Sequence, residues 1–542
     1  MNALHFFFLF LFLVNNSSYG LDTPPLSAVG LNGLSFFSPR SQSTDAARRL
    51  AGIHTHLYEC DTRSFFSLLT ITPIYTRSTW PRHIAETLFG HEQVAVTGSY
   101  DSFSATNTIQ ERTTHDIFAD YFGLSPDFKS SVFLNPRLQN ALVEGDLYLG
   151  LDCIYPGVYF RAILPVGWTE WRLGINEFIG YNSQNTPFPA GYQSEGPDDL
   201  PVNVFCFTQA VLGHKSFGAN STGLEHDLFG STHTLTGCSD LYMQFGWNII
   251  LESDKHVGIN VQGAAPTGSR PKGIYLFEPI LGNGKHWELG FGVSGHSTIW
   301  EEPMNQSMAI FLDLNFTHIF KARQHRTFDL TEPNGFGSRY ILMKVFEDGT
   351  FKGNVIPVGN VTRLACNVHC DAQFDGVVML AYTYKNFLFD IGYDGWIRTR
   401  ELISLQDCIE ENTYGLKGIQ NVYDELTSTF DQKTESIATL EEVPINPDDP
   451  NAAKIARADV TPRFISLSNV NPFSAASPMI LTHKIFAYLG YDNHINQDCP
   501  YAIFFGVGAE VEFEGINTHL TAVPNRQTLS QWIVWARGGI DF

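Results

Sequence analysis

The stretch QWIVWARGGIDF, residues 531–542 at the end of the chain, decides the fold. Alternate side chains of a β-strand point to opposite faces. One face therefore carries Trp532, Val534, Ala536, Gly538, Ile540 and Phe542, and the other carries Ile533, Trp535, Arg537, Gly539 and Asp541. This period of two predicts a strand with one apolar face and one mixed polar face.

A second stretch shows the same alternation over a longer run. Its apolar row consists of Ile503, Phe505, Val507, Ala509, Val511 and Phe513. The opposite row includes Glu510, Glu512 and Glu514, and three carboxylates on one face of a strand need water. Two further alternating runs flank the short Lys385-Asn386 connection and predict a tight hairpin. The sequence thus predicts antiparallel strands that are apolar on one side and polar on the other.

Ending the chain on an aromatic residue in such a strand resembles the C-terminal signature of Gram-negative outer-membrane β-barrels. In that class the final strand closes the barrel, which implies a role in closure and assembly for Phe542, Ile540 and Trp532. The resemblance covers about residues 62–542 by pattern and implies location in the cell outer membrane. It is porin-like at the level of the class and indicates no narrower family.

The other end of the chain favours export. Residues Phe6–Val14 form an apolar block that is too short to span a bilayer, followed by polar residues and Gly20. This predicts a secretory signal peptide over residues 1–20, although no Lys or Arg precedes the block. Elsewhere the sequence lacks the roughly 18 continuous apolar residues of a membrane helix. A membrane protein of this kind must be a closed barrel, because an open sheet edge leaves backbone groups unpaired in lipid.

Composition agrees with this interpretation. The chain of 542 residues contains 46 Gly, 43 Phe, 21 Tyr and 9 Trp, and only 17% of its residues are charged. The aromatics suit girdles at two membrane interfaces, although a soluble β-sandwich would also use them in its core. The net charge of -22 argues against nucleic acid as a partner. We therefore predict an all-β, transmembrane, antiparallel up-and-down barrel of roughly 12 to 16 strands with long surface loops.

The expected organisation is a signal peptide, a leader and one barrel. Residues 21–61 form either a poorly ordered leader or a segment inside the lumen, and residues 62–542 form the barrel. Residues 401–476 form a long acidic insertion, which is a lumen constriction, an external lid or an inert loop. Within it, Asn421–Ala438 is compatible with a helix. If Phe542 is periplasmic, the insertion lies outside, and our strand count also places the Glu252–Lys255 connection outside.

The eight cysteines include a close pair, Cys366 and Cys370, with His369 between them. An exported chain can form disulfides, but the pairing cannot be read from the sequence. Two thiols and one imidazole without a fourth ligand make a weak zinc site, so a loop disulfide or free thiols are favoured. We expect no metal and no cofactor.

A barrel of about 12 or more strands is wider than its own side chains need to fill, which predicts a water-filled passage. Mixed charges would screen solutes, and carboxylates would favour cations, unless these side chains are only a solvated wall. The candidate lining residues are Glu510, Glu512, Glu514, Asp390, Asp394, Arg398, Arg537, Asp541 and Arg161.

The function predicted from these residues is a porin-like channel for passive passage of small solutes. Its expected partners are outer-membrane lipid, the barrel assembly machinery and small solutes, with homo-oligomerisation left open. The alternative is a structural or adhesive surface antigen whose loops do the work. An outer-membrane hydrolase is disfavoured because the chain has no Gly-x-Ser-x-Gly elbow, so we expect no enzyme. A transporter of hydrophobic solutes would carry an N-terminal plug, and Leu21–Ala51 is polar for that role.

Overall fold

The computed structural model describes most of the chain. The described residues are 36, 38–57, 66–89, 92–98, 117–182, 186–188, 201–230, 232–302, 306–331, 337–416, 421–424, 429–432, 464–493, 502–515 and 529–542. The predicted signal peptide, Cys60 and Cys499 lie outside these residues. Among the described residues, none of the helices is both long and apolar enough to cross a membrane.

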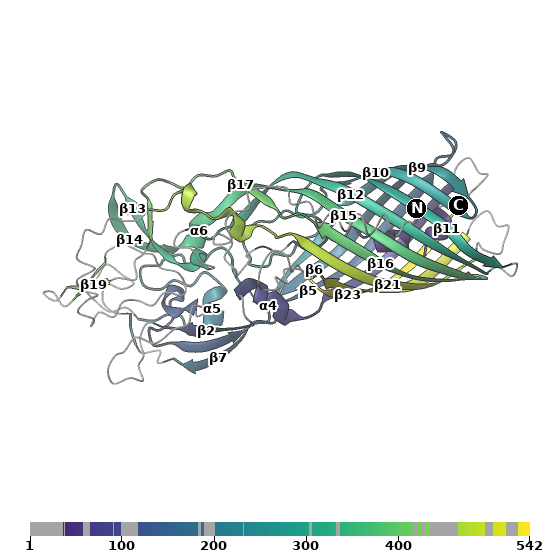
Figure 1. The fold of residues 1–542 in the computed structure, drawn as a ribbon. Coiled ribbons are helices and arrows are strands. Elements are labelled where there is room, and N and C mark those ends of the chain that lie inside the picture. Colours follow the sequence, from purple (N-terminus) through teal and green to yellow (C-terminus); the bar gives the residue numbers. More distant parts are fainter. Residues whose placement is uncertain are drawn as a thin grey trace.

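Twelve described strands form a closed antiparallel barrel (Figure 1). Each strand pairs with the barrel strands before and after it in the chain, and the first and last strands pair with each other, so the barrel is of the up-and-down type. The predicted fold class and strand number are confirmed. The strands are β1 (Phe66–Ser78), β5 (Arg137–Gly150), β6 (Val158–Arg172), β9 (Leu241–Glu252), β10 (Lys255–Ala265), β11 (Glu288–Glu302), β12 (Gln306–Thr327), β15 (Arg363–Tyr384), β16 (Phe387–Arg398), β21 (Ile480–Asp492), β22 (Ala502–Glu514) and β23 (Gln531–Asp541).

The two faces of the wall differ in polarity, as the alternation predicts. On β22, Val507 is 59% exposed on the outside, whereas Glu510 is 1% exposed on the inside. The same holds on β23, where Val534 points outward and Arg537 inward. Every strand of the barrel contributes an exposed apolar side chain to the outer face: Ile71, Val143, Val166, Phe245, Val261, Phe291, Phe316, Val378, Ile391, Ile485, Val507 and Val534.

The two ends of the barrel also differ. Short turns such as Lys385-Asn386 lie at the end where the chain terminates, and long connections lie at the other end (Figure 1). The expectation that Glu252–Lys255 lies at the opposite end from Lys385-Asn386 is wrong. Four barrel strands, from β10 to β15, separate the two turns, and an even number of strands returns the chain to the same end.

The long connections build a lobe with its own apolar core. One sheet contains β2 (Gln93–Thr97), β3 (Ile117–Phe118), β4 (Lys129–Phe133) and β7 (Asn176–Tyr181), and a second contains β13 (Leu342–Glu347), β14 (Thr350–Pro357) and β18 (Tyr414–Leu416). The helices α4 (Pro81–Phe89), α5 (Phe207–Val211) and α6 (Val358–Thr362) accompany them. Rings such as Phe118, Phe207 and Phe229 fill this core, so the lobe is a packed unit rather than a set of separate loops.

The remaining strands extend the wall or lie in the long insertion. β8 (Thr232–Cys238) pairs with β6, and β17 (Leu402–Leu405) pairs with β15. The helical expectation for Asn421–Ala438 is wrong where the chain is described, because β19 (Asn421–Asp424) and β20 (Thr429–Gln432) form a hairpin. Residues 433–463 of the insertion lie outside the described residues.

Candidate functional site

Residues 38–57, called the lumen segment below, lie inside the barrel. They contain two short helices, α2 (Ala46–Leu50) and α3 (His54–Leu57). Asp45 caps α2 by accepting a hydrogen bond of 3.1 Å from the backbone N–H of Arg48. Gly52 then turns the chain at φ +76, where an added Cβ would lie 2.4 Å from the ring of Tyr488 on β21. The close fit of this turn against the wall therefore requires glycine.

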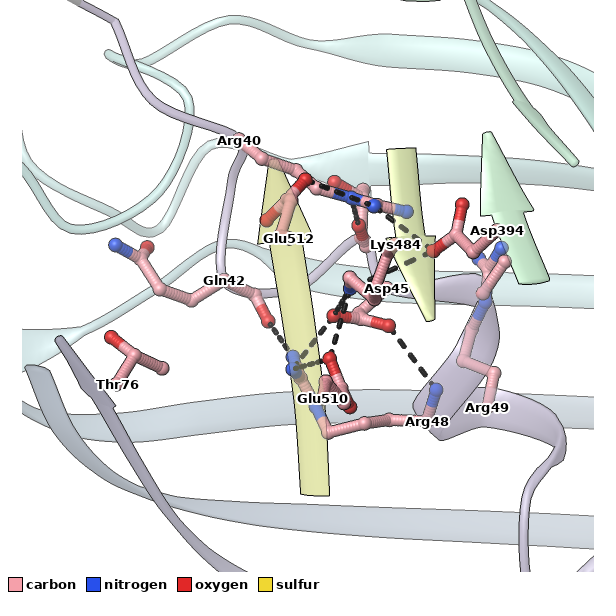
Figure 2. A network of polar contacts seen from close by, with 12 residues as sticks. Arg40, Gln42, Asp45, Arg48, Arg49, Thr76, Asp394, Lys484, Glu510 and Glu512 are labelled. Atoms are coloured by element: carbon pink, nitrogen blue, oxygen red, sulfur yellow. Dashed lines mark hydrogen bonds and ion pairs between the residues drawn. The ribbon is translucent and has the colours of Figure 1, made fainter. Parts of the chain in front are cut away.

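Arg40 anchors the start of the lumen segment to three strands (Figure 2). Its guanidinium lies 2.6 Å from Asp375 on β15, 3.0 Å from Asp394 on β16 and 3.7 Å from Glu512 on β22. All four side chains are at most 5% exposed. Buried charges are tolerated only when they are paired, so these carboxylates and this arginine depend on one another.

Arg48 and Asp45 form a second group of charges with Lys484 of β21 (Figure 2). Arg48 lies 2.7 Å from Asp45 and 3.8 Å from Glu510, while Lys484 lies 2.5 Å from Asp45 and 3.0 Å from Glu510. Burial alone would lower the pKa of Arg48, but the charges of Asp45, Glu510 and Glu144 raise it above its usual value. Arg48 therefore stays charged, and the two acidic groups hold it in place.

The far end of the lumen segment is bound to the last strand. Arg537 of β23 donates hydrogen bonds of 2.8 Å to the carbonyls of Arg48 and Ala51. His56 is fully buried between Asp492, at 2.9 Å, and Asp541, at 3.2 Å. Burial lowers the pKa of His56, but hydrogen bonds and charges from these two carboxylates raise it to about 9. At neutral pH His56 is thus an imidazolium that joins the segment to the ends of β21 and β23.

Two small cavities lie against the lumen segment. One of about 30 Å³ is bordered by Arg40 and Arg48, and one of about 10 Å³ is bordered by Arg49. Such volumes hold one or two water molecules. Beside these three arginines the segment therefore packs closely against the barrel wall.

The structure brings most of the predicted lining residues to one place. Seven of the nine contact the lumen segment: Glu510, Glu512, Asp390, Asp394, Arg398, Arg537 and Asp541. Arg161 instead pairs with Asp146 on the neighbouring strand at 2.7 Å, and Glu514 at the rim lies 3.4 Å from His83. That they line a passage stays a prediction.

The sequence interpretation missed both the wall partners Asp375 and Lys484 and the charged residues of the segment. Arg40, Arg48 and Arg49 fall within ten residues of a chain with a net charge of -22. That local excess of arginine was the available signal, because an acidic lumen needs a basic occupant.

The thiols take no part in this site. Cys366 and Cys370 are buried on β15, and the strand alternation places His369 on the opposite face. The six cysteines among the described residues form no disulfide with one another, and the described side chains contain no cluster of three or more metal-ligating groups.

No protein-family model and no curated protein matches this chain. Its structure is similar to solved outer-membrane barrels. An outer membrane channel from Pseudomonas putida F1 is 9% identical, with a TM-score of 0.35 over 90% of this chain and 98% of that one. The Pseudomonas putida toluene transporter TodX is 9% identical, with a TM-score of 0.31 over 95% and 96%. The Escherichia coli outer membrane protease OmpT is 7% identical, with a TM-score of 0.22 over 88% and 96%.

Proposed function

We propose that this protein is an outer-membrane channel for small solutes, and that the conformation described here is its closed state. One observation carries the proposal. The barrel wall has an apolar outer face and a charged inner face, and the inner face binds the lumen segment. The lobe of long connections would face outward from the cell, and the short turns would face the periplasm.

The outer face supports a membrane location. Large apolar side chains such as Ile71, Phe245 and Val507 are each more than half exposed, and similar residues continue around all twelve strands. Soluble monomers rarely expose continuous apolar patches beyond a few hundred Å². A lipid bilayer is the environment in which such a surface is stable, and outer-membrane barrels carry an apolar band about 25 Å tall.

The inner face supports transport. The lumen segment is bound by side-chain ion pairs and hydrogen bonds and is not a strand of the barrel. The ring of backbone pairing is complete without it, since β1 and β23 pair directly through nine residue pairs. A closed wall with a removable occupant is the arrangement expected of a gated passage.

Deleting residues 38–57 tests the proposal. The full-length protein, refolded and inserted into a planar bilayer, should conduct weakly, and the deletion variant should conduct at least tenfold more. Val507→Leu serves as a control, because Val507 lies on the outer face of β22 and the change leaves the lumen segment intact. Equal conductance of full-length and deleted protein would contradict a closed state.

A surface antigen remains the second candidate, because the lobe is a large packed unit at the outer end of the barrel. The same experiment separates the two functions. If the deletion variant inserts and changes its mobility on heating but never conducts, the barrel is an anchor for the lobe rather than a channel.

A further inference from the structure

An apolar groove of about 710 Å³ lies on the outer wall across β9, β10, β11 and β12. Its outward-facing lining consists of Phe245, Val261, Trp287, Leu289 and Phe320, each more than 40% exposed. Trp287 and Phe320 form the edge of the groove that is nearer to the lobe, and there the backbone N–H of Phe320 donates to the carbonyl of Trp287 at 2.9 Å. A hollow of this kind can hold hydrocarbon chains.

Basic side chains begin where the groove ends. Lys321 follows Phe320 directly and is exposed, and Arg323, also exposed, lies two residues beyond Lys321 on β12, about 7 Å at the usual rise of a strand. The connection between β10 and β11 adds Arg270 and Lys272, both exposed. These four cations occupy the rim of one side of a chain whose net charge is -22.

Backbone contacts hold this cluster together. The N–H of His325 donates to the carbonyl of Pro271 at 3.3 Å, which fixes Arg270 beside β12. Arg363 of β15 donates from Nε to the carbonyl of Lys272 at 2.8 Å, which adds a fifth cation. His325 lies within electrostatic reach of Arg270, Arg323 and Arg363.

Two carboxylates offset part of the charge of this cluster. Glu278 accepts hydrogen bonds from the backbone N–H groups of Lys272 and Gly273 and lies within electrostatic reach of the side chains of Lys272 and Arg363. Asp407 accepts a hydrogen bond from the backbone N–H of Ala365 and lies within electrostatic reach of His325. Within the described part of the chain, none of the five cations forms an ion pair. The five cations outnumber these two carboxylates, which leaves positive charge that a mobile anion can satisfy.

We propose that the groove and the basic cluster together form a binding site for a phosphorylated membrane lipid. The acyl chains would lie in the groove, and the headgroup phosphates would contact Arg270, Lys321 and Arg323. Guanidinium groups bind phosphate through paired hydrogen bonds, which gives specificity as well as attraction. This inference rests on the proposed membrane location, since it places the groove at the lipid-facing surface and the cluster at its outer rim.

The experiment measures lipid retention by the full-length barrel in detergent, using native mass spectrometry. The probe is a synthetic glucosamine disaccharide lipid with two phosphates and six acyl chains, compared with the same lipid after removal of both phosphates. We expect the phosphorylated lipid to bind at least tenfold more tightly. The triple variant Arg270→Gln, Lys321→Gln and Arg323→Gln should remove that preference, and Val261→Trp should weaken both lipids by filling the groove.

A matched control replaces Arg77, Arg137 and Arg172 by Gln, because these arginines lie at the same rim on β1, β5 and β6, away from the groove. If both triple variants weaken binding of the phosphorylated lipid equally, the lipid is attracted to positive charge anywhere on the rim, and the proposed site is contradicted. Competition by millimolar inorganic phosphate would show a simple anion site and would also overturn it. If the barrel binds the phosphorylated lipid but never conducts, the channel is contradicted and the lipid site stands. If it conducts but shows no preference for the phosphorylated lipid, the lipid site is contradicted and the channel stands.

Discussion

The inner and outer faces of the barrel wall consist of the same strands but are stabilised in different ways. Outward residues such as Val507 need only a nonspecific apolar solvent, so many apolar side chains can replace them. Inward residues such as Asp394 and Glu510 need particular partners on a segment more than 300 residues away in sequence. The wall therefore tolerates replacement of one apolar side chain by another on its outer face. On its inner face, replacing a single charged side chain leaves its partner with a weakened or missing ion pair.

The largest effect should come from removing one inner partner. Replacing Arg40→Leu removes the nearest cation of Asp375 and Asp394, which keep only Arg49 at 3.8 Å and Lys484 at 3.6 Å, and breaking a buried pair costs about 3–5 kcal/mol. Denaturant unfolding of the refolded protein should show a matching loss of stability or a released lumen segment. The triple variant Arg40→Leu, Asp375→Leu and Asp394→Leu should recover much of the loss, and failure to do so would contradict mutual pairing.

A charge on the outer face should have the next largest effect. Val507→Lys places an ammonium in the apolar belt and should destabilise the inserted barrel by about 2–4 kcal/mol if the site lies near the bilayer midplane. Val507→Leu is the matched control and should be nearly neutral. A neutral result for the lysine variant would show that this face is not in lipid.

Alkaline pH should loosen the inner face without affecting the outer one. Because the pKa of His56 is raised from 6.5 to about 9, its stabilising charge is complete below pH 6.5 and is lost as the pH rises through 9. The imidazole faces Asp492, Asp541 and the ring of Phe504. Conductance should therefore rise several-fold between pH 7 and pH 10, and His56→Gln should abolish that dependence. A pH profile that is unchanged in the variant would contradict the role of His56.

Ion selectivity should depend on the inner carboxylates only after the lumen segment is removed. In the full-length chain Glu510 and Glu512 face Arg48, Lys484 and Arg40. In the protein without residues 38–57, Glu512 loses Arg40 and Glu510 keeps only Lys484 of the wall, so more of their charge is available to attract cations. Replacing Glu510, Glu512 and Glu514 by Gln in that background should shift the reversal potential in a salt gradient away from cation preference. No shift would show that these groups do not set selectivity.

The smallest effect is expected in the long insertion. β19 and β20 pair only with each other among the described strands, so the barrel does not depend on them. Deleting Asn421–Pro450 should leave insertion and heat-dependent gel mobility unchanged. Loss of assembly would mean that this stretch supports the wall.

The sequence predicted the wall well and its contents poorly. The faces of β22 and β23 followed from a period of two, because burial in lipid forces every outward position to be apolar. The lumen segment carries no such pattern, since its helices span only five and four residues, and they meet both charged groups and apolar wall residues such as Phe311 and Phe66. The lobe was equally hidden, because short strands such as β2 and β13 cannot be told from barrel strands by alternation alone.

Closure of the barrel joins the two ends of the polypeptide. Phe542 and Ser67 exchange backbone hydrogen bonds of 2.8 and 2.9 Å across more than 470 residues of sequence. During synthesis β1 therefore waits, with one edge unpaired, until the last strand has been made, and such open edges pair readily with other chains. The residues just before β1 must also be enclosed when the ring is sealed, so the order of assembly determines what the finished barrel contains.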